Sequence, residues 1–344
     1  MTHHSATPHY PFTAIVGQDA LRHALLLSVV DPSLGGVLAI GDRGTGKTTA
    51  VRALAGLLPP QQVRRGCPYG CAPDRPMCAH CEGASGKAVR RPVPVVDLPL
   101  GASEDRVAGA LDIERALIDG QKRFEPGLLA KANRGFLYID EVNLLEDHIV
   151  DLLLDVAASG WNVVERDGLS VRHPARFVLV GSGNPEEGEL RPQLLDRFGL
   201  CVEVATPGDP AQRVEIIRRR EAFETDPVAF ARRHARAQTA LRSRLNEARE
   251  RLVTVRADDA MLHGAAQLCI ALGTDGLRGE LTLMKAARAH CALDGRPGVT
   301  LDDLRFVAPF ALAHRLRRDP LDDARGTVRV ERALEEVLPH RKAA

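Results

Sequence analysis

The chain has 344 residues, of which 44% are hydrophobic and 26% charged, which is the composition of a globular protein of about two domains. Lysine and arginine number 46 against 45 acidic residues, and the resulting charge of +1 argues against a protein that coats nucleic acid. No apolar run approaches the roughly 18 residues of a membrane span. The first residues lack the basic-then-apolar pattern of a signal peptide, so we expect a cytoplasmic protein.

Short apolar runs alternate with helical patterns up to about residue 205. The runs at residues 36–40, 94–98, 135–140 and 177–181 predict buried strands, and helices are predicted from Asp19, over 47–58 and over 147–159. Residues 161–172 alternate around Asp167-Gly168, which predicts a hairpin. This alternation predicts an α/β fold with a central, mainly parallel sheet covered on both faces.

The rest of the chain has helical patterns and almost no strand signal. We therefore predict an α/β domain over residues 1–207 and a C-terminal helical bundle over 208–344. Within the first domain, residues 60–92 are irregular and rich in Gly, Pro and Cys, and residues 104–134 mix helix and hairpin signals.

A phosphate-binding loop lies between the first predicted strand and the next helix. The sequence from Gly41 to Thr48 fits G-x-x-x-x-G-K-[ST], whose glycines let backbone N–H groups turn toward phosphates at a helix N-terminus. Lys47 is predicted to reach the β- and γ-phosphates of ATP, and the Thr48 hydroxyl to coordinate Mg²⁺. The nucleotide-binding residues predicted here are Gly41, Asp42, Arg43, Gly44, Thr45, Gly46, Lys47, Thr48 and Thr49.

Two adjacent acids end the predicted strand 135–140. A carboxylate at the C-terminal edge of a parallel sheet lies beside the phosphate loop, so we expect Asp140 to hold Mg²⁺ through water. Glu141 is predicted to be the general base that polarises the attacking water.

Three further polar residues are candidates for the same reaction. Asn184 follows the strand 177–181 and is predicted to orient the lytic water, although Asn-Pro is also an ordinary turn signal. Arg197 follows a predicted helix and is a candidate arginine finger for a neighbouring subunit; on local sequence alone, a solvated arginine is the simpler interpretation. Arg278 is predicted to open a helix from which it reaches back to the nucleotide, with a capping or surface role as the alternative.

Taken together, these motifs resemble those of AAA+ ATPases and, more narrowly, of the small ATPase (I) subunit family of magnesium chelatase. The resemblance runs through nearly the whole chain. It is carried by the phosphate loop and by the segments 12–18, 95–101, 135–145, 181–188, 191–199 and 277–281.

The resemblance assigns roles that spacing alone does not give. Adenine contacts are implied for Ile15, Val16, Gly17 and Gln18. Residues 104–134 would form a helix-2 insert and 161–172 the hairpin before the first sensor. Asn184 would be that sensor, Arg197 the arginine finger and Arg278 the second sensor.

The same resemblance implies a ring, with six subunits as the expected number, and two partners. These are a larger AAA+-like D subunit and a porphyrin-binding H subunit, in which Mg²⁺ enters protoporphyrin IX during (bacterio)chlorophyll synthesis. The alternatives are a related cobalt chelatase ATPase, a helix-2-insert DNA motor and a chaperone-like assembly ATPase. Nucleic acid is not an expected partner of the chelatase subunit.

Four cysteines lie close together in the predicted loop 60–92. Cys67, Cys71, Cys78 and Cys81 have the spacing C-x3-C-x6-C-x2-C, which suits a Cys₄ site for Zn²⁺ or an iron–sulfur cluster. Redox-active or spare thiols are the alternatives. Because some members of the family that this chain resembles lack these cysteines, catalysis is not expected to require them.

Overall fold

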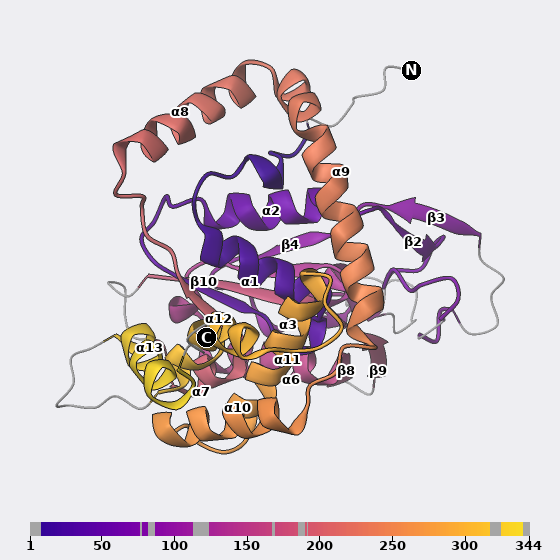
Figure 1. Cartoon of the computed structure of the whole chain (residues 1–344). Coiled ribbons are helices and arrows are strands. Elements are labelled where there is room, and N and C mark those ends of the chain that lie inside the picture. The colour runs from indigo at the N-terminus through magenta and orange to yellow at the C-terminus, as the bar shows by residue number, and fades with distance from the viewer. Residues whose placement is uncertain are drawn as a thin grey trace. The chain divides into compact units, whose positions relative to one another are not determined.

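A computed structural model gives the fold of the chain (Figure 1). The structure describes residues 8–75, 78–81, 87–112, 124–166, 169–184, 190, 192–316 and 325–339. The chain forms two compact units. The first contains the stretches Met1–Gly17, Gly41–Glu189 and Ala205–Gln238, and the second contains Gln18–Ile40, Leu190–Val204 and Thr239–Ala344.

Five short strands hydrogen-bond in the order β11-β1-β10-β7-β4. They are β1 (Val37–Ile40), β4 (Val95–Leu98), β7 (Phe136–Ile139), β10 (Val178–Gly183) and β11 (Leu200–Glu203). The pairs β4–β7, β7–β10 and β1–β11 are parallel. The four predicted strands are confirmed, whereas β11 was not predicted.

Helices and three hairpins surround the strands of the first unit. Figure 1 shows α2 on one side of β4 and β10, and α3 and α6 on the other. The helical elements are η1 (Phe12–Ala14), α2 (Lys47–Leu57), α3 (Glu104–Ala108), α5 (Leu128–Ala132), η3 (Val142–Leu144), α6 (Asp147–Ser159) and α8 (Pro210–Thr225). The hairpins pair β2 (Gln61–Arg64) with β3 (Ala88–Arg91), β5 (Gly109–Leu111) with β6 (Phe124–Pro126), and β8 (Trp161–Arg166) with β9 (Leu169–Pro174).

The hairpins bear on three sequence predictions. The hairpin predicted over 161–172 is confirmed as β8–β9, while its turn at residues 167–168 lies outside the described residues. The mixed signals of 104–134 correspond to α3, β5, β6 and α5, with 113–123 outside the described part. The loop 60–92 was predicted to be irregular, and this is wrong at its two ends, where β2 and β3 pair.

The second unit is mainly helical. Its elements are α1 (Asp19–Val30), η2 (Pro32–Leu34), α7 (Pro192–Arg197), α10 (Asp259–Leu272), α11 (Arg278–Leu293), α12 (Leu301–Leu312), η5 (Ala313–Arg315) and α13 (Gly326–Val337). The helix α9 (Pro227–Leu252) begins in the first unit and ends in the second. Helices α10 to α13 pack on one another around buried Leu268, Leu283, Leu304 and Val330, which confirms the predicted helical bundle. The division at residue 207 stays a prediction.

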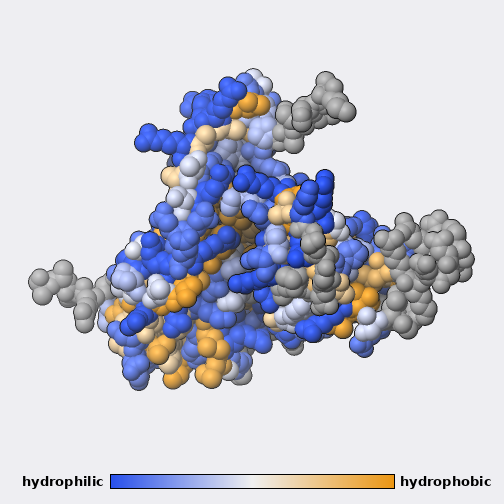
Figure 2. Space-filling view, turned by 90° about the vertical axis from the view of Figure 1, so that its right-hand side faces the viewer, coloured by the Kyte–Doolittle hydropathy of each residue, from blue (hydrophilic) through white to orange (hydrophobic). Residues whose placement is uncertain are grey.

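Some apolar side chains of the second unit remain on its surface. On α10, Leu262 is 45% and Ile270 77% exposed. Figure 2 shows orange, hydrophobic surface at its lower edge, the level at which Figure 1 places α10. Among the described helices, none combines the length and apolarity needed to cross a bilayer.

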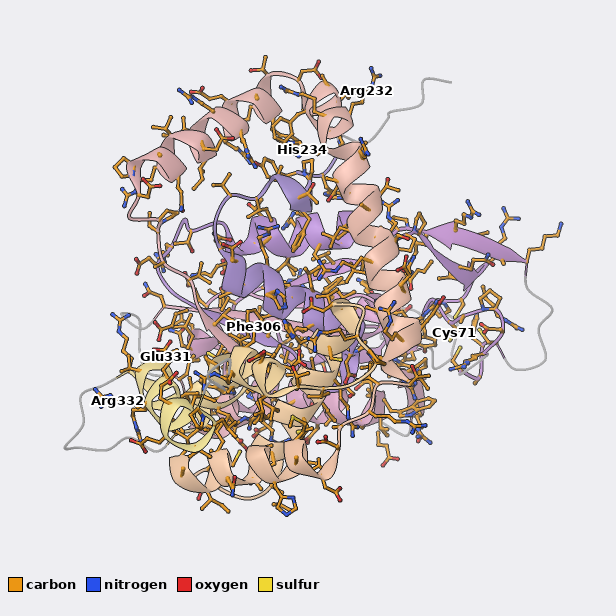
Figure 3. All side chains as sticks on the ribbon, in the orientation of Figure 1. Cys71, Arg232, His234, Phe306, Glu331 and Arg332 are labelled. Carbon is orange, nitrogen blue, oxygen red and sulfur yellow. The ribbon has the colours of Figure 1, made fainter. Side chains whose placement is uncertain are left out.

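Two histidines of the second unit are held in apolar surroundings. The His23 ring lies 4.7 Å from that of Phe306, which Figure 3 labels, and 5.1 Å from that of His290. Burial, assisted by the nearby His290, lowers the pKa of His23 to about 4. His314 lies 3.0 Å from the Phe198 carbonyl through its Nε2, and burial lowers its pKa to about 3.

These histidines should make folding stability depend on pH. Each binds a proton near pH 6.5 only in the unfolded chain, so the free energy of unfolding should fall as the pH drops below 6.5. The loss is about 1.4 kcal/mol per pH unit for each histidine, until its folded pKa is reached. Denaturant titrations at pH 7 and pH 5 should therefore show about 2 kcal/mol less pH dependence in His23→Phe than in the parent chain. His148→Gln, at an exposed histidine, is the control; equal pH dependence in all three proteins would contradict the account.

Candidate active site

The predicted phosphate loop connects β1 to α2. Gly44 and Gly46 have φ angles of 75° and 84°, in the left-handed region that glycine adopts without a side-chain clash. Gly46 is the N-cap of α2, and Lys47 is its first residue. The Gly41 N–H donates to the Gly183 carbonyl at 2.9 Å, so the loop begins beside the end of β10. Backbone amides at a helix N-terminus are thus available to phosphate.

The first two residues of α2 point functional groups toward the loop and toward β7. The Lys47 ammonium donates to the Asp42 carbonyl at 2.9 Å and also to that of Gly41, so it lies against the loop. The Thr48 hydroxyl donates to the Tyr138 hydroxyl at 2.9 Å. Thr48 is therefore tied to the strand that carries the acidic pair.

A chain of hydroxyl groups connects Thr48 with Asp140. The Tyr138 hydroxyl donates to Asp140 Oδ1 at 3.2 Å, and the Ser182 hydroxyl donates to the same oxygen at 2.5 Å. Burial raises the pKa of Tyr138, so its hydroxyl keeps its proton and remains a donor. Carboxylate and hydroxyl oxygens are hard ligands of the kind that Mg²⁺ prefers. Thr48 and Asp140 thus fit a divalent cation bound with a nucleotide.

Glu141 has an unusual backbone conformation. Its φ of 52° lies in the left-handed region, which costs energy for a residue with a side chain and is typical of functional sites. The Glu141 N–H donates to Ser182 Oγ at 3.2 Å. Its carboxylate forms an ion pair with Arg43 of the phosphate loop, at 2.8 Å. Ser182 therefore contacts both acids, and the loop itself contacts the predicted general base.

Asn184 follows β10 directly and is only 9% exposed. Its neighbour Gly183 accepts the hydrogen bond from Gly41, which places Asn184 near the start of the phosphate loop. The structure thus brings together the loop, the acidic pair and Asn184 within the first unit. Residues 185–189 lie outside the described part.

The segment predicted to contact adenine also has a constrained backbone. Gly17 and Gln18 have φ angles of 66° and 53°, and Gln18 is the N-cap of α1. Just before them, the Ala14 carbonyl accepts a hydrogen bond from Arg219 at 3.0 Å. Ile15 and Val16 are partly exposed. Their contact with adenine stays a prediction.

The two predicted arginines of the second unit flank one aspartate. Arg197 is exposed and ends α7, and Arg278 begins α11 as predicted. Arg278 forms an ion pair with Asp196. Arg315, whose side chain is 4% exposed, also pairs with the Asp196 carboxylate and donates to the Asp196 carbonyl at 2.8 Å. This double pairing fixes the end of α7 that carries Arg197.

Sequence reasoning missed several residues of these arrangements. The contacts of Tyr138 and Ser182 depend on the register of neighbouring strands, which the sequence does not give. Arg315 is 119 residues from its partner Asp196 in the sequence. Arg43 was predicted to contact nucleotide, but its pairing with Glu141 was not foreseen. A signal was present only for Tyr138 and Ser182, which are polar residues inside or at the end of apolar strands.

Comparisons with known proteins agree with this geometry. A family profile described as AAA lid domain matches residues 262–337, and one described as magnesium chelatase, subunit ChlI, matches residues 112–194. The magnesium-chelatase 38 kDa subunit of Acidiphilium rubrum is 65% identical over 331 residues, which cover 94% of this chain and 96% of that protein. The chain belongs to the magnesium chelatase ChlI family. The 38 kDa subunit of Rhodobacter capsulatus is 63% identical, covering 96% of this chain and 95% of its own length.

Two solved structures extend the comparison. A model of the complex between magnesium chelatase subunits BchI and BchD, based on cryo-electron microscopy, contains a chain 61% identical to this one. That match has a TM-score of 0.56 and covers 91% of this chain and 98% of the other. A putative ATPase from Cytophaga hutchinsonii is 16% identical with a TM-score of 0.63, covering 94% and 91% of the two chains. The latter likeness concerns the fold alone, whereas the AAA lid profile is matched by the sequence itself.

Ser182 offers a direct test of the acidic pair. Ser182→Ala removes the group that contacts both Asp140 and the backbone of Glu141, so both acids should lose their orientation. Loss of such supporting hydrogen bonds typically costs about 10–100-fold in activity. The ATP hydrolysis rate should fall by this amount while ATP affinity, measured by calorimetry, changes little.

Ser170→Ala is the matched control, because that hydroxyl donates to Glu165 on the β8–β9 hairpin and not to either member of the acidic pair. A normal hydrolysis rate in Ser182→Ala would show that the acids do not depend on this contact.

Proposed function

We propose that this chain is the ATP-hydrolysing motor subunit of magnesium chelatase, which drives Mg²⁺ insertion into protoporphyrin IX in (bacterio)chlorophyll synthesis. The observation that carries the proposal is the hydrogen-bonded connection from Thr48 through Tyr138 to Asp140 beside the phosphate loop. The relatives named above are magnesium-chelatase subunits, which does not favour a cobalt chelatase or a DNA motor.

Under this proposal, the candidate site residues of the first unit each have a role in hydrolysis. Lys47 neutralises charge on the β- and γ-phosphates, and the loop amides orient them. Thr48 and Asp140 hold the Mg²⁺ that arrives with ATP. Glu141 accepts a proton from the attacking water, which Asn184 orients.

The ion pair of Glu141 with Arg43 adds a step to this scheme. Arg43 contacts an oxygen of the Glu141 carboxylate, and the attacking water needs such an oxygen as the acceptor of its proton. Glu141 must therefore leave or loosen this pair to accept a proton. Since Arg43 lies in the phosphate loop, we propose that phosphate binding draws Arg43 away and frees the base.

Arg197 and Arg278 are proposed to act on the nucleotide as finger and second sensor. Their shared neighbour Asp196 supports this, because a movement of α11 would be passed through the Arg278–Asp196 pair to the residue next to Arg197. The proposed lid is the helical part over residues 208–344, which contains the matched lid profile.

A ring of identical subunits, six in number, is part of the proposal, together with the D and H subunits. One relative is solved in complex with BchD, which supports a D-type partner. The exposed apolar side chains of α10 and α11 supply a surface for such contacts. Ile270, Leu277 and Leu281 are 77%, 73% and 62% exposed.

The chelatase assignment is tested by reconstitution with D and H subunits, following Mg-protoporphyrin formation. Glu141→Gln keeps the shape of the side chain but cannot take a proton. The variant should bind ATP with nearly normal affinity, hydrolyse it at least about 100-fold more slowly and form no Mg-protoporphyrin. Chelatase activity that persists in this variant would refute the coupling, and lost ATP affinity would refute the base role.

Arg197 tests whether hydrolysis requires a neighbouring subunit. Arg197→Ala should bind ATP nearly normally but hydrolyse it more slowly, since arginine fingers contribute about 10³–10⁵ to turnover in other systems. Lys47→Ala should be inactive for a different reason, because its own phosphate loop is damaged. Mixing the two inactive proteins should restore part of the activity, as an intact loop then faces an intact Arg197. Mixed rings verified by tagged pull-down that stay inactive would assign Arg197 a role within its own subunit.

A further inference from the structure

The loop between β2 and β3 gathers four cysteines around one point. All seven cysteines lie among the described residues, and none of them forms a disulfide there. The sulfur atoms of Cys67, Cys71, Cys78 and Cys81 all lie within 4.8 Å of one another, and three of these residues are buried. Figure 3 labels Cys71 of this group. We propose that the four cysteines bind a single Zn²⁺ as a tetrahedral, structural site.

The sulfur separations favour one metal ion over a cluster. Zn–S bonds are about 2.3 Å long, so two sulfurs of a tetrahedral site lie about 3.8 Å apart. The observed Cys67–Cys78 and Cys71–Cys78 sulfur distances are 3.8 and 3.6 Å. In a four-iron cluster each thiolate binds a different iron, with inorganic sulfide between the irons, and this spreads the sulfurs further apart. A disulfide requires about 2.0 Å and joins only two of the four cysteines.

The backbone around the sulfurs is already fixed. The Cys67 N–H donates to the Arg64 carbonyl at 3.2 Å, and the Arg64 N–H donates to the Cys71 carbonyl at 3.0 Å. The Cys81 N–H donates to the Cys78 carbonyl at 2.8 Å, which closes a tight turn between the second pair of ligands. Both chelating pairs are therefore held by hydrogen bonds that do not involve sulfur.

Side chains outside the loop hold it in place. The Tyr69 ring stacks on the buried His173 of β9 with centroids 4.5 Å apart, and the Tyr69 carbonyl accepts a hydrogen bond from buried Asn133 at 2.7 Å. Arg64 donates to the Cys81 carbonyl at 2.8 Å, and Arg134 to the Gly70 carbonyl at 3.2 Å. Zn²⁺ with four thiolates has a net charge of −2, and these two guanidinium groups lie where they offset it.

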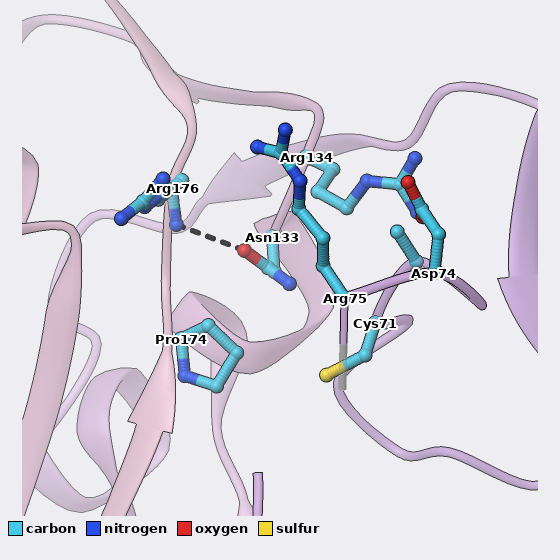
Figure 4. A pocket seen from close by; sticks show the side chains of 8 residues that line it. Cys71, Asp74, Arg75, Asn133, Arg134, Pro174 and Arg176 are labelled. Carbon is cyan, nitrogen blue, oxygen red and sulfur yellow. Dashed lines mark hydrogen bonds between the residues drawn. The ribbon is translucent and has the colours of Figure 1, made fainter. Parts of the chain in front are cut away.

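A surface cavity adjoins the site. Its volume is about 300 Å³, and its lining includes Cys71, Asp74, Arg75, Arg134 and Arg176 (Figure 4). Cys71 contributes to this lining but is itself buried, whereas Cys67 is partly exposed and is the sulfur that an ion or a chelator reaches first. A zinc site agrees with the type and number of the ligands, with the spacing of their sulfurs, with the hydrogen bonds around them and with their accessibility.

The test is metal analysis of the full chain, purified without added metal or chelator. Elemental analysis should find one zinc per chain. When a mercurial reagent modifies the thiols, zinc should be released in proportion to the number of thiols modified. After replacement of zinc by Co²⁺, the protein should show the intense visible absorption of tetrahedral cobalt thiolate. Cys78→Ser should lower bound zinc at least 10-fold under a competing chelator, whereas Cys269→Ser, which replaces a buried cysteine of α10, should retain it.

Cys81→His guards against a variant that fails to fold, because histidine is itself a zinc ligand and should keep one zinc at reduced affinity. Iron accompanied by acid-labile sulfide would overturn the mononuclear site, and one iron without sulfide would overturn the choice of zinc. A metal-free chain with four titratable thiols, or with a Cys67–Cys71 or Cys78–Cys81 disulfide in mass spectra, would overturn metal binding altogether.

Discussion

The parallel register between β7 and β10 is the constraint on which the active site depends. Gly181 lies opposite Ile139, so the next residues, Ser182 and Asp140, meet at the same level of the sheet. Side chains alternate between the two faces of a strand, and a slip of one residue would turn Ser182 away from Asp140. The same register sets Tyr138, two residues before Asp140, on the face where it reaches Thr48. One strand pairing therefore positions the proposed metal-binding carboxylate, the proposed general base and the start of the phosphate loop.

Much of this arrangement was predictable because it follows from local sequence. The phosphate loop is a contiguous motif between a strand and a helix, and the acids end a purely apolar strand. The contacts among them were not predictable, because they require knowing which strands are neighbours. β11 was missed for a related reason. Leu200–Glu203 is only four residues long and pairs with β1, more than 160 residues earlier, so its own sequence is too short to establish a strand. Arg315 lies at the end of a helical pattern, where a basic residue is ordinary, and its burial against Asp196 comes from packing.

The pairing of Asp196 with two arginines suggests how nucleotide state reaches the rest of a ring. Arg315 is nearly buried, and burial lowers its pKa, although Asp196 opposes that change. Such a pair is costly to break, because either partner would be left as a desolvated charge. Arg278 is half-exposed, and its ion pair with the same carboxylate is correspondingly easier to exchange. Asp196 thus has one permanent and one exchangeable partner. If Arg278 turns toward a nucleotide, Asp196 stays anchored through Arg315 but loses one of its two partners, and this change lies next to Arg197.

The cysteine loop follows a different physical principle from the rest of the first unit. The segment from β2 to β3 spans about 31 residues, rich in Gly and Pro, and segments of that size bury too little apolar surface to hold one conformation by packing alone. Its buried core consists of Tyr69, three cysteines and Ala130, with Cys67 at the edge. Four thiols and one tyrosine contribute little hydrophobic free energy, yet the loop is anchored at Asn133, Arg134 and His173. A metal ion supplies the missing cross-link, because its binding free energy becomes folding free energy when the ligands come together only in the folded loop. The anchors lie just before β7 and on β9, so a zinc-braced loop would stiffen the strand that carries the acidic pair without contacting ATP.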